Sequence, residues 1–258
     1  MGEHLWMCVG LRSDYAVQQR DGRYLRAFRP LSSALLSAHL AGRLTIGTYV
    51  ITAEGTCSFA VFDADRSDGL AVLLDVQQLL AEQGYPAYLE QSRRGGHLWL
   101  FFAQPTPAEQ IRRWLGPIAS ARALELYPRQ AGGKGIGSLI RMPFGKHRRS
   151  GQRYPFLDRE LRPVAPTVAE QVAWLAQVER IVPPDLPQVS IPAHRSSSTQ
   201  WVAHGRSIRE WNAQQDPFAL IGRYVHLDSN GSGRCPFGSH HAGAVMLLPH
   251  FACILHKG

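Results

Sequence analysis

The segment CSFAVFDAD, residues 57–65, decides how the fold is interpreted, because an apolar run rich in β-branched and aromatic residues ends there in two carboxylates. Such a run predicts a strand. Side chains alternate between the faces of a strand, so Asp63 and Asp65 are expected on one face and Ala64 on the other. Two carboxylates that close repel each other unless a cation lies between them, and a divalent ion suits that place. The alternative is an ordinary strand end in which Asp68 caps the next helix.

Further strands and helices are expected on both sides of this segment. Short runs rich in β-branched and aromatic residues predict strands, and apolar residues at helical spacing between capping signals predict helices. A capping box at 106–109 is expected to open one helix, which should kink or break at Gly116-Pro117. The strands are expected at 47–51, 57–65, 86–92, 97–103, 123–127 and within 137–147, and the helices at 30–42, 68–84, from 106 onward and from 167 to about 180.

Composition divides the chain into three parts. Antiparallel strand pairs mixed with helices predict an α/β domain of the α+β kind over residues 1–182. The stretch 183–204 is rich in proline and serine and is expected to be a linker. A small module with short helices is expected at 205–258.

The net charge of the chain indicates which classes of partner it favours. The 258 residues carry a net charge of +8 at pH 7, which favours phosphate-rich partners such as nucleic acid or nucleotides, although a merely solvated basic surface has the same composition. No stretch approaches a membrane span, and the first residues lack the layout of a secretory signal, so no membrane partner and a cytoplasmic location are expected. Cys8 and Cys57 are expected to be reduced, small core residues.

Residues with catalytic chemistry recur at the ends of the predicted strands. His97 follows the glycine-rich turn SRRGG, whose N–H groups can approach a phosphate, and Glu125 begins another strand. A basic loop then supplies Arg141, Lys146, His147 and Arg148. Three acids, a turn histidine and a basic loop fit two-metal phosphoryl or nucleotidyl transfer with Mg²⁺ or Mn²⁺. A single histidine at the start of a strand also has a purely structural interpretation.

Four motifs in this order resemble the archaeo-eukaryotic primase superfamily. They are VFDAD at 61–65, SRRGGHLWLFF at 92–102, ELYPRQ at 125–130 and LIRMPFGKH at 139–147. The resemblance spans roughly residues 14–158. It is strongest to the primase-polymerase domains of TOTE conflict systems and of CRISPR-associated primase-polymerases. The family fold is an RRM-like core beside a small N-terminal α/β unit, so this architecture is expected here.

The resemblance also implies residue roles. Asp63, Asp65 and Glu125 would be the catalytic acids that bind two Mg²⁺ or Mn²⁺ ions, although Asp is more usual than Glu at the third position. The residues implied to bind the nucleotide are Ser92, Arg94, Gly96, His97, Arg141, Lys146 and His147. The implied function is a DNA primase-polymerase that joins NTPs or dNTPs on a DNA template, with de novo primer synthesis as a further option.

Two other functions remain open from the residues alone. A metal-dependent nuclease would use similar carboxylates, although the basic loop and the glycine–histidine turn favour a bound triphosphate. A catalytically inactive nucleic-acid-binding module would keep the basic surface without needing all three acids. A helicase, a nuclease or CRISPR adaptation proteins are partners by family analogy only.

The C-terminal segment DPFALIGRYVHLDSNGSGRCPF, residues 216–237, resembles the start of a CHC2-type zinc finger of bacterial primases. The family's Cys-Pro-x-His is altered here, because the histidines follow Cys235 only after several residues. Cys235, His240, Cys253 and His256 could together bind Zn²⁺ tetrahedrally. A degenerate or truncated finger is the alternative.

Overall fold

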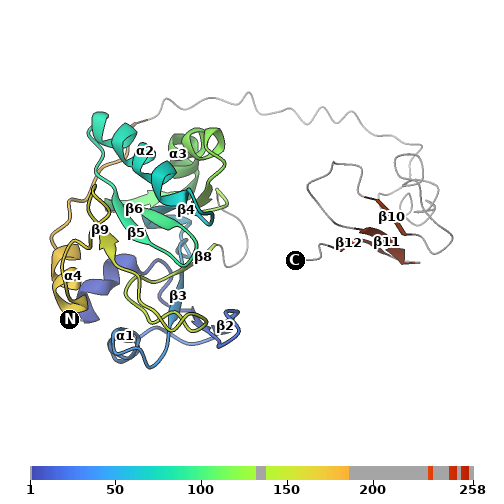
Figure 1. Ribbon diagram of the computed structural model, residues 1–258, viewed down its shortest axis with the longest axis horizontal. Helices are drawn as coiled ribbons and strands as arrows, with labels where there is room; N and C mark the ends of the chain where they lie inside the picture. The colour runs from blue at the N-terminus through green and yellow to red at the C-terminus, as the bar shows by residue number, and fades with distance from the viewer. Residues whose placement is uncertain (1, 132–137, 186–231, 235–243, 249–250, 256–258) are drawn as a thin grey trace. The chain divides into compact units, whose positions relative to one another are not determined.

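The computed structural model describes residues 2–131, 138–185, 232–234, 244–248 and 251–255. Backbone contacts divide the chain into two compact units, Met1–Pro187 and Gln188–Gly258. In the first unit, Figure 1 shows two sheets and their helices. Within the described residues, no helix is long and apolar enough to cross a membrane.

The larger sheet contains the strand that the CSFAVFDAD segment forms. Its five strands lie in the order β7-β4-β6-β5-β9, and all neighbouring strands pair antiparallel. Helices α2 and α3 pack against its strands and cover one face, as Figure 1 shows. The strands are β4 (Thr56–Ala64), β5 (Tyr88–Gln91), β6 (Gly96–Pro107), β7 (Glu125–Tyr127) and β9 (Phe156–Leu157), and the helices are α2 (Gly69–Glu82) and α3 (Ala108–Ala121).

Chain order and strand order together identify the architecture. The order β4-α2-β5-β6-α3-β7 is a β-α-β-β-α-β unit, and its four strands lie fourth, first, third, second across the sheet. This is the RRM-like core that the family resemblance implied, and the α/β fold class is confirmed. The core is aromatic: Phe59 and Trp99 are fully buried with ring centroids 5.3 Å apart, and Trp99 stacks on Phe101 at 6.0 Å.

The second sheet contains four strands in the order β2-β1-β3-β8. Three of them come from the N-terminal part of the chain, but β8 follows the RRM-like core in sequence and pairs with β3. The N-terminal unit is therefore completed by a later strand. Its elements are the 3₁₀ helix η1 (Gly2–Cys8), β1 (Tyr15–Gln18), β2 (Tyr24–Ala27), α1 (Ser33–Leu40), β3 (Ile46–Tyr49) and β8 (Leu139–Arg141), and α4 (Val168–Leu175) follows later.

Two local predictions at α3 are wrong. Thr106 does not cap this helix, because β6 continues to Pro107 and Thr106 is paired with Cys57 in the ladder. The helix also does not break at Pro117 but continues to Ala121. Its apolar face, including Ile111 and Leu115, is buried. This packing outweighs the cost of the backbone hydrogen bond that Pro117 cannot donate.

The other strands and helices predicted for the first unit form with changed lengths, and Asp68 precedes α2 without a capping hydrogen bond from its side chain. The Thr167–Glu170 capping box forms, although α4 ends at Leu175 and not near residue 180. Cys8 and Cys57 are free and buried in the core. Burial raises the pKa of the Cys57 thiol to about 12, so it stays protonated at neutral pH. The strands β1, β2 and β9 and the helix η1 were not predicted.

In the second unit, three short strands form an antiparallel sheet in the order β10-β11-β12. They are β10 (Ser232–Arg234), β11 (Ala244–Leu248) and β12 (Phe251–Leu255). Of the predicted zinc ligands, Cys235, His240 and His256 lie outside the described residues, and Cys253 is described only through the backbone of β12. Most of the predicted linker and the helices expected after it also lie outside the described residues, so the zinc site and the domain boundaries stay predictions.

Candidate active site

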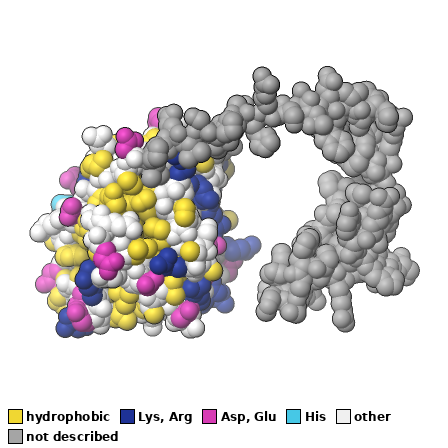
Figure 2. Space-filling view, turned by 90° about the horizontal axis from the view of Figure 1, so that it is seen from above, with side chains coloured by type: hydrophobic (Ala, Val, Ile, Leu, Met, Phe, Trp, Pro, Cys, Tyr) yellow, Lys and Arg dark blue, Asp and Glu magenta, His cyan; other side chains and the backbone are white. Residues whose placement is uncertain are grey.

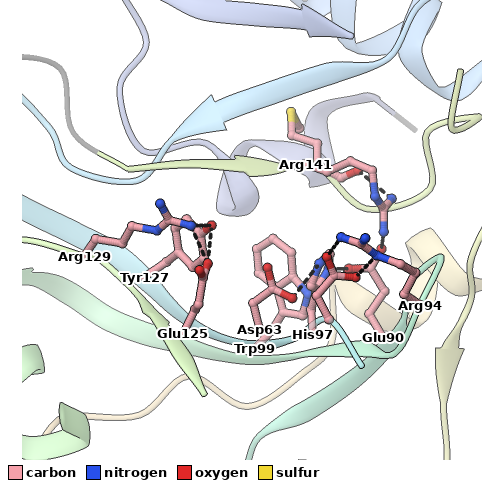
Figure 3. Close-up of polar contacts among 11 residues, drawn as sticks. Asp63, Glu90, Arg94, His97, Trp99, Glu125, Tyr127, Arg129 and Arg141 are labelled. Carbon is pink, nitrogen blue, oxygen red and sulfur yellow. Dashed lines mark hydrogen bonds and ion pairs between the residues drawn. The ribbon is translucent and has the colours of Figure 1, made fainter. Parts of the chain in front are cut away.

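One face of the five-stranded sheet carries a polar row across four strands. Asp63 on β4 lies directly opposite Glu125 on β7 and opposite His97 on β6, and His97 lies opposite Glu90 on β5. Directly paired residues of neighbouring strands point to the same face. The row therefore reads Glu125, Asp63, His97, Glu90, and Figure 3 shows Asp63 between two hydrogen-bonded groups.

Glu90 closes one end of the row. Its side chain is completely buried, and each carboxylate oxygen is used. One oxygen accepts from the His97 ring nitrogen Nδ1 at 2.8 Å and from the Trp99 indole at 3.0 Å, and the other pairs with Arg141 at 2.6 Å. Because Arg141 belongs to β8, this ion pair connects the two sheets. Burial raises the pKa of the Glu90 carboxyl. Arg141 and His97 together lower it by more, so the pKa lies below the ordinary value.

The contact with Glu90 fixes the orientation of the His97 ring. A carboxylate can only accept a hydrogen bond, so Nδ1 carries the hydrogen and Nε2 is the nitrogen left for other contacts. Nε2 lies 3.8 Å from Oδ1 of Asp63. His97 is itself buried. The turn histidine found in the sequence is therefore held by a carboxylate behind it and faces the first acid of the DAD motif.

Asp63 is the least compensated acid of the row. Its side chain is 18% exposed, and the 3.8 Å approach to His97 is its only ion-pair contact among the described residues. Burial raises the pKa of Asp63, and the negative charge of Glu125 raises it further, while His97 opposes both. A carboxylate in this state favours either a proton or an added cation.

Glu125 forms the open end of the row. Its side chain is 57% exposed and forms an ion pair with Arg129, four residues later in the chain. The Tyr127 hydroxyl donates to the same carboxylate oxygen at 3.1 Å, and the Arg129 guanidinium lies over the Tyr127 ring at 4.9 Å. Figure 3 shows these three side chains as a group beside Asp63.

Asp65 lies just beyond the end of β4 and is paired with Arg94 of the glycine-rich turn. The turn is pressed against the end of β4: a Cβ on Gly95 would lie 1.9 Å from the Ala64 carbonyl oxygen, and one on Gly96 would lie 2.7 Å from Leu70. These glycines are thus explained by packing within the protein. The Ser92 N–H is also used internally and donates to the Gly95 carbonyl.

The basic residues of the loop after β8 do not act as one group. Arg141 is buried in its ion pair with Glu90. His147 is half-buried and lies 3.2 Å from Gln18, while Lys146 is exposed. Burial lowers the pKa of His147, and the positive charges of Arg141, Arg93 and Arg149 lower it further. The last two arginines therefore contribute to a positive field near His147.

The acids suit a hard divalent cation in their chemistry. Asp63 and Glu125 are carboxylates on adjacent strands, while Asp65 pairs with Arg94 and Glu125 pairs with Arg129, two arginines that are more than half exposed. In their present positions, no three carboxylate, imidazole or thiol side chains within residues 2–131 and 138–185 lie close enough together to hold a metal ion. Arg94 and Arg129 provide the neutralising positive charge instead.

Comparison with protein-family models identifies the family of this chain. The model for the archaeo-eukaryotic primase domain of TOTE conflict systems matches residues 14–189, which is more than half of the chain. The chain belongs to this family. Membership in the TOTE primase family supports primase or polymerase nucleotidyl transfer in general, and such enzymes generally use divalent metal ions.

Other comparisons are weaker. No curated protein matches the sequence. Among solved structures, the polymerase domain of Mycobacterium tuberculosis Ligase D in complex with DNA matches with 15% identity and a TM-score of 0.42, covering 69% of this chain and 86% of that one. The catalytic domain of primase Repb' in complex with initiator DNA matches with 14% identity and a TM-score of 0.38, covering 68% and 93% of the two chains.

Sequence reasoning missed four residues of this TOTE primase site: Glu90, Trp99, Tyr127 and Arg129. Glu90 carried a usable signal, because an acid inside a short apolar strand needs a buried partner. Arg129 follows Glu125 at a spacing of four, but in a strand and loop that spacing predicts no contact. The structure was needed to show that these residues hold the two ends of the row.

Proposed function

We propose that this member of the TOTE primase family is a template-directed nucleotidyltransferase that joins NTPs or dNTPs on a DNA template. The observation that carries the proposal is the cross-strand row, which places Asp63 between a second carboxylate and an oriented histidine on one face of the sheet. Family membership supports the same reaction class.

In this proposal the acids have distinct tasks. Asp63 and Glu125 hold the metal, and Asp65 joins them when Arg94 turns to the triphosphate. Bound Mg²⁺ or Mn²⁺ would supply the positive charge that activates the attacking 3′-hydroxyl and stabilises the leaving pyrophosphate. The raised pKa of Asp63 supports a role as the central ligand, because an added cation removes the cost of its buried charge.

His97 binds the incoming nucleotide in this proposal. Its Nδ1 is committed to Glu90, so Nε2 can donate to a phosphate oxygen when the ring is protonated. Glu90 is a positioning residue, since it acts only through His97, and Arg141 in turn holds Glu90. Arg93 and Arg149 add positive charge near His147 on the side where the triphosphate would lie.

The experiment combines single-stranded DNA, with and without an annealed primer, labelled NTPs or dNTPs, and Mn²⁺. The wild type should extend or start strands, and Asp63→Asn should lower the rate by about 10³-fold or more. Glu125→Gln should lower it by about 10²-fold. The matched control is Asp75→Asn, which removes an exposed carboxylate on α2 that pairs with Arg122 and should leave the rate unchanged.

The outcomes separate the three functions. Longer products that depend on Asp63 support the polymerase, and products formed without a primer add de novo synthesis. Shortened DNA that depends on Asp63 supports the metal-dependent nuclease instead. Binding of DNA by wild type and Asp63→Asn alike, with no change in the DNA, supports the inactive binding module.

A further inference from the structure

A shallow groove of about 490 Å³ lies on the N-terminal sheet, apart from the polar row. It is formed by the end of β1 and its turn, by the loop between α1 and β3, and by the loop after β8. The residues that matter for its chemistry are Gln18, Arg20, Arg43 and Arg148, and Asp21 is the one acid among the described residues of its lining.

Hydrogen bonds tie the three segments of the groove together. Gln18 is 4% exposed, and its Oε1 accepts the Arg148 backbone N–H at 2.9 Å. The Arg148 guanidinium donates to the Gly42 carbonyl at 3.3 Å, which connects the loop after β8 to the loop after α1. Hydrogen bonds within the first unit therefore fix the segments that form the groove relative to one another.

The groove carries positive charge without a counter-ion. Arg20 and Arg43 are exposed, and neither they nor Arg148 form an ion pair with a carboxylate among the described residues. Asp21 does not compensate them, because it pairs with Arg23 at 2.6 Å. Three guanidinium groups around one concavity favour a ligand with several phosphates, since each can bind a phosphate through two N–H groups.

The groove is connected to the proposed site through His147. The Nε2 atom of Gln18 lies 3.2 Å from the His147 ring, and Arg93 and Arg149 act electrostatically on the same ring. Positive charge thus continues from the β5–β6 turn, past His147, to the groove. Figure 2 shows Lys and Arg side chains gathered along one side of the first unit.

We propose that this groove binds successive phosphates of a single DNA strand that passes the polar row. The proposal rests on the proposed function, because the strand is taken to be the template or the product. A groove that follows a backbone with arginines and without base-specific contacts suits a strand of any sequence.

The test measures binding of a fluorescent single-stranded oligonucleotide by anisotropy at several salt concentrations. Arg20→Ala/Arg43→Ala should weaken binding about tenfold at low salt and should reduce the slope of log K against log salt by about 1.4, which corresponds to two lost phosphate contacts. The matched control is Arg159→Ala, an exposed arginine on the turn before Arg162 with no ion pair among the described residues. It should change binding less than twofold. Unchanged melting midpoints would show that both variants fold.

Three results would overturn the proposal. They are a wild type that does not bind the oligonucleotide, a double variant that binds as Arg159→Ala does, and a double variant that loses affinity for a nucleoside triphosphate but not for the oligonucleotide. Failure of the proposed function is a different result: the wild type binds DNA through the groove but synthesises nothing. Asp63→Asn should retain oligonucleotide binding, which keeps the two outcomes distinguishable.

Discussion

The two ends of the polar row use the same pair of residue types in opposite ways. Glu90 pairs with Arg141, and both side chains are 7% exposed or less. Glu125 pairs with Arg129, and both are more than half exposed. The first carboxylate also receives hydrogen bonds from His97 and Trp99, whereas Tyr127 is the only further donor to the second within the part of the chain that the structure describes.

The difference in burial decides what each ion pair can do. A buried pair cannot open without leaving a charge in a low-dielectric interior, so Glu90 stays in place and holds His97. An exposed pair is worth little, because water solvates both partners when it opens. Glu125 can therefore exchange Arg129 for another cation, and Glu90 cannot. The row combines one fixed end with one end that can respond to a ligand.

The largest expected effect is the loss of stability in Glu90→Gln, which should exceed the loss in Glu125→Gln. Glu90→Gln keeps the size of the side chain but leaves Arg141 as a buried charge without a partner, which should lower the free energy of unfolding by about 3–5 kcal/mol. Glu125→Gln should lower it by about 1 kcal/mol or less. Urea denaturation of both variants at neutral pH gives the two values.

This comparison also has a pH dependence with a defined sign. Because Arg141 and His97 lower the pKa of folded Glu90, its contribution to stability is present above the ordinary carboxyl pKa and is lost as the pH falls through the lowered value. The gap between wild type and Glu90→Gln should accordingly shrink in acid. Equal losses for the two glutamine variants would contradict the distinction between a fixed and an open end.

The fold was accessible from sequence because its signals are local. The β4 strand, the α2 helix and the β5–β6 hairpin could each be located from local signals, whereas the RRM-like arrangement was expected only from the family resemblance. The errors at Thr106 and Pro117 arose where tertiary contacts outweigh local preference. The hairpin of β1 and β2 escaped notice because its strands have only four residues each and are joined by the polar segment 19–23.

The site was only half accessible from sequence, for a physical reason. Asp63, His97 and Glu125 stand at strand ends, where polar residues attract attention. Glu90 also lies next to the end of its strand, but its partner Arg141 comes 51 residues later from the other sheet, and no local pattern connects the two. The nucleotide contact that the resemblance implied for Arg141 stays a prediction. Its ion pair with Glu90 was missed because a sequence shows charges but not which of them pair. Packing of the two sheets determines that Arg141 supports the site from behind.

A smaller effect is expected from Arg129→Ala, which removes the arginine that competes with a metal for Glu125. The apparent affinity for Mn²⁺ should rise by up to about fivefold, the equivalent of the roughly 1 kcal/mol that an exposed ion pair can contribute. Isothermal titration of Mn²⁺ in the presence of a nucleoside triphosphate measures the change. Arg159→Ala is the control for loss of one surface charge. A weaker affinity for Mn²⁺ in Arg129→Ala would show that Arg129 helps to bind the ligand and does not compete for Glu125.

The smallest expected effect is a gain in stability from Asp63→Asn without metal. Burial and Glu125 raise the pKa of folded Asp63, so its contribution to stability is full below the ordinary carboxyl pKa and is lost as the pH rises through the raised value. Asparagine has no such loss. The melting temperature of Asp63→Asn should thus equal that of wild type near about pH 4 and exceed it by on the order of 2 °C near neutral pH. Thermal melts in a chelator measure this difference, and Asp75→Asn, which loses an exposed acid, should not show it.

Added Mn²⁺ should then stabilise the wild type more than Asp63→Asn. A wild type with a higher melting temperature than the variant at neutral pH in chelator would mean that His97 already compensates Asp63, and Asp63 would then not need a cation.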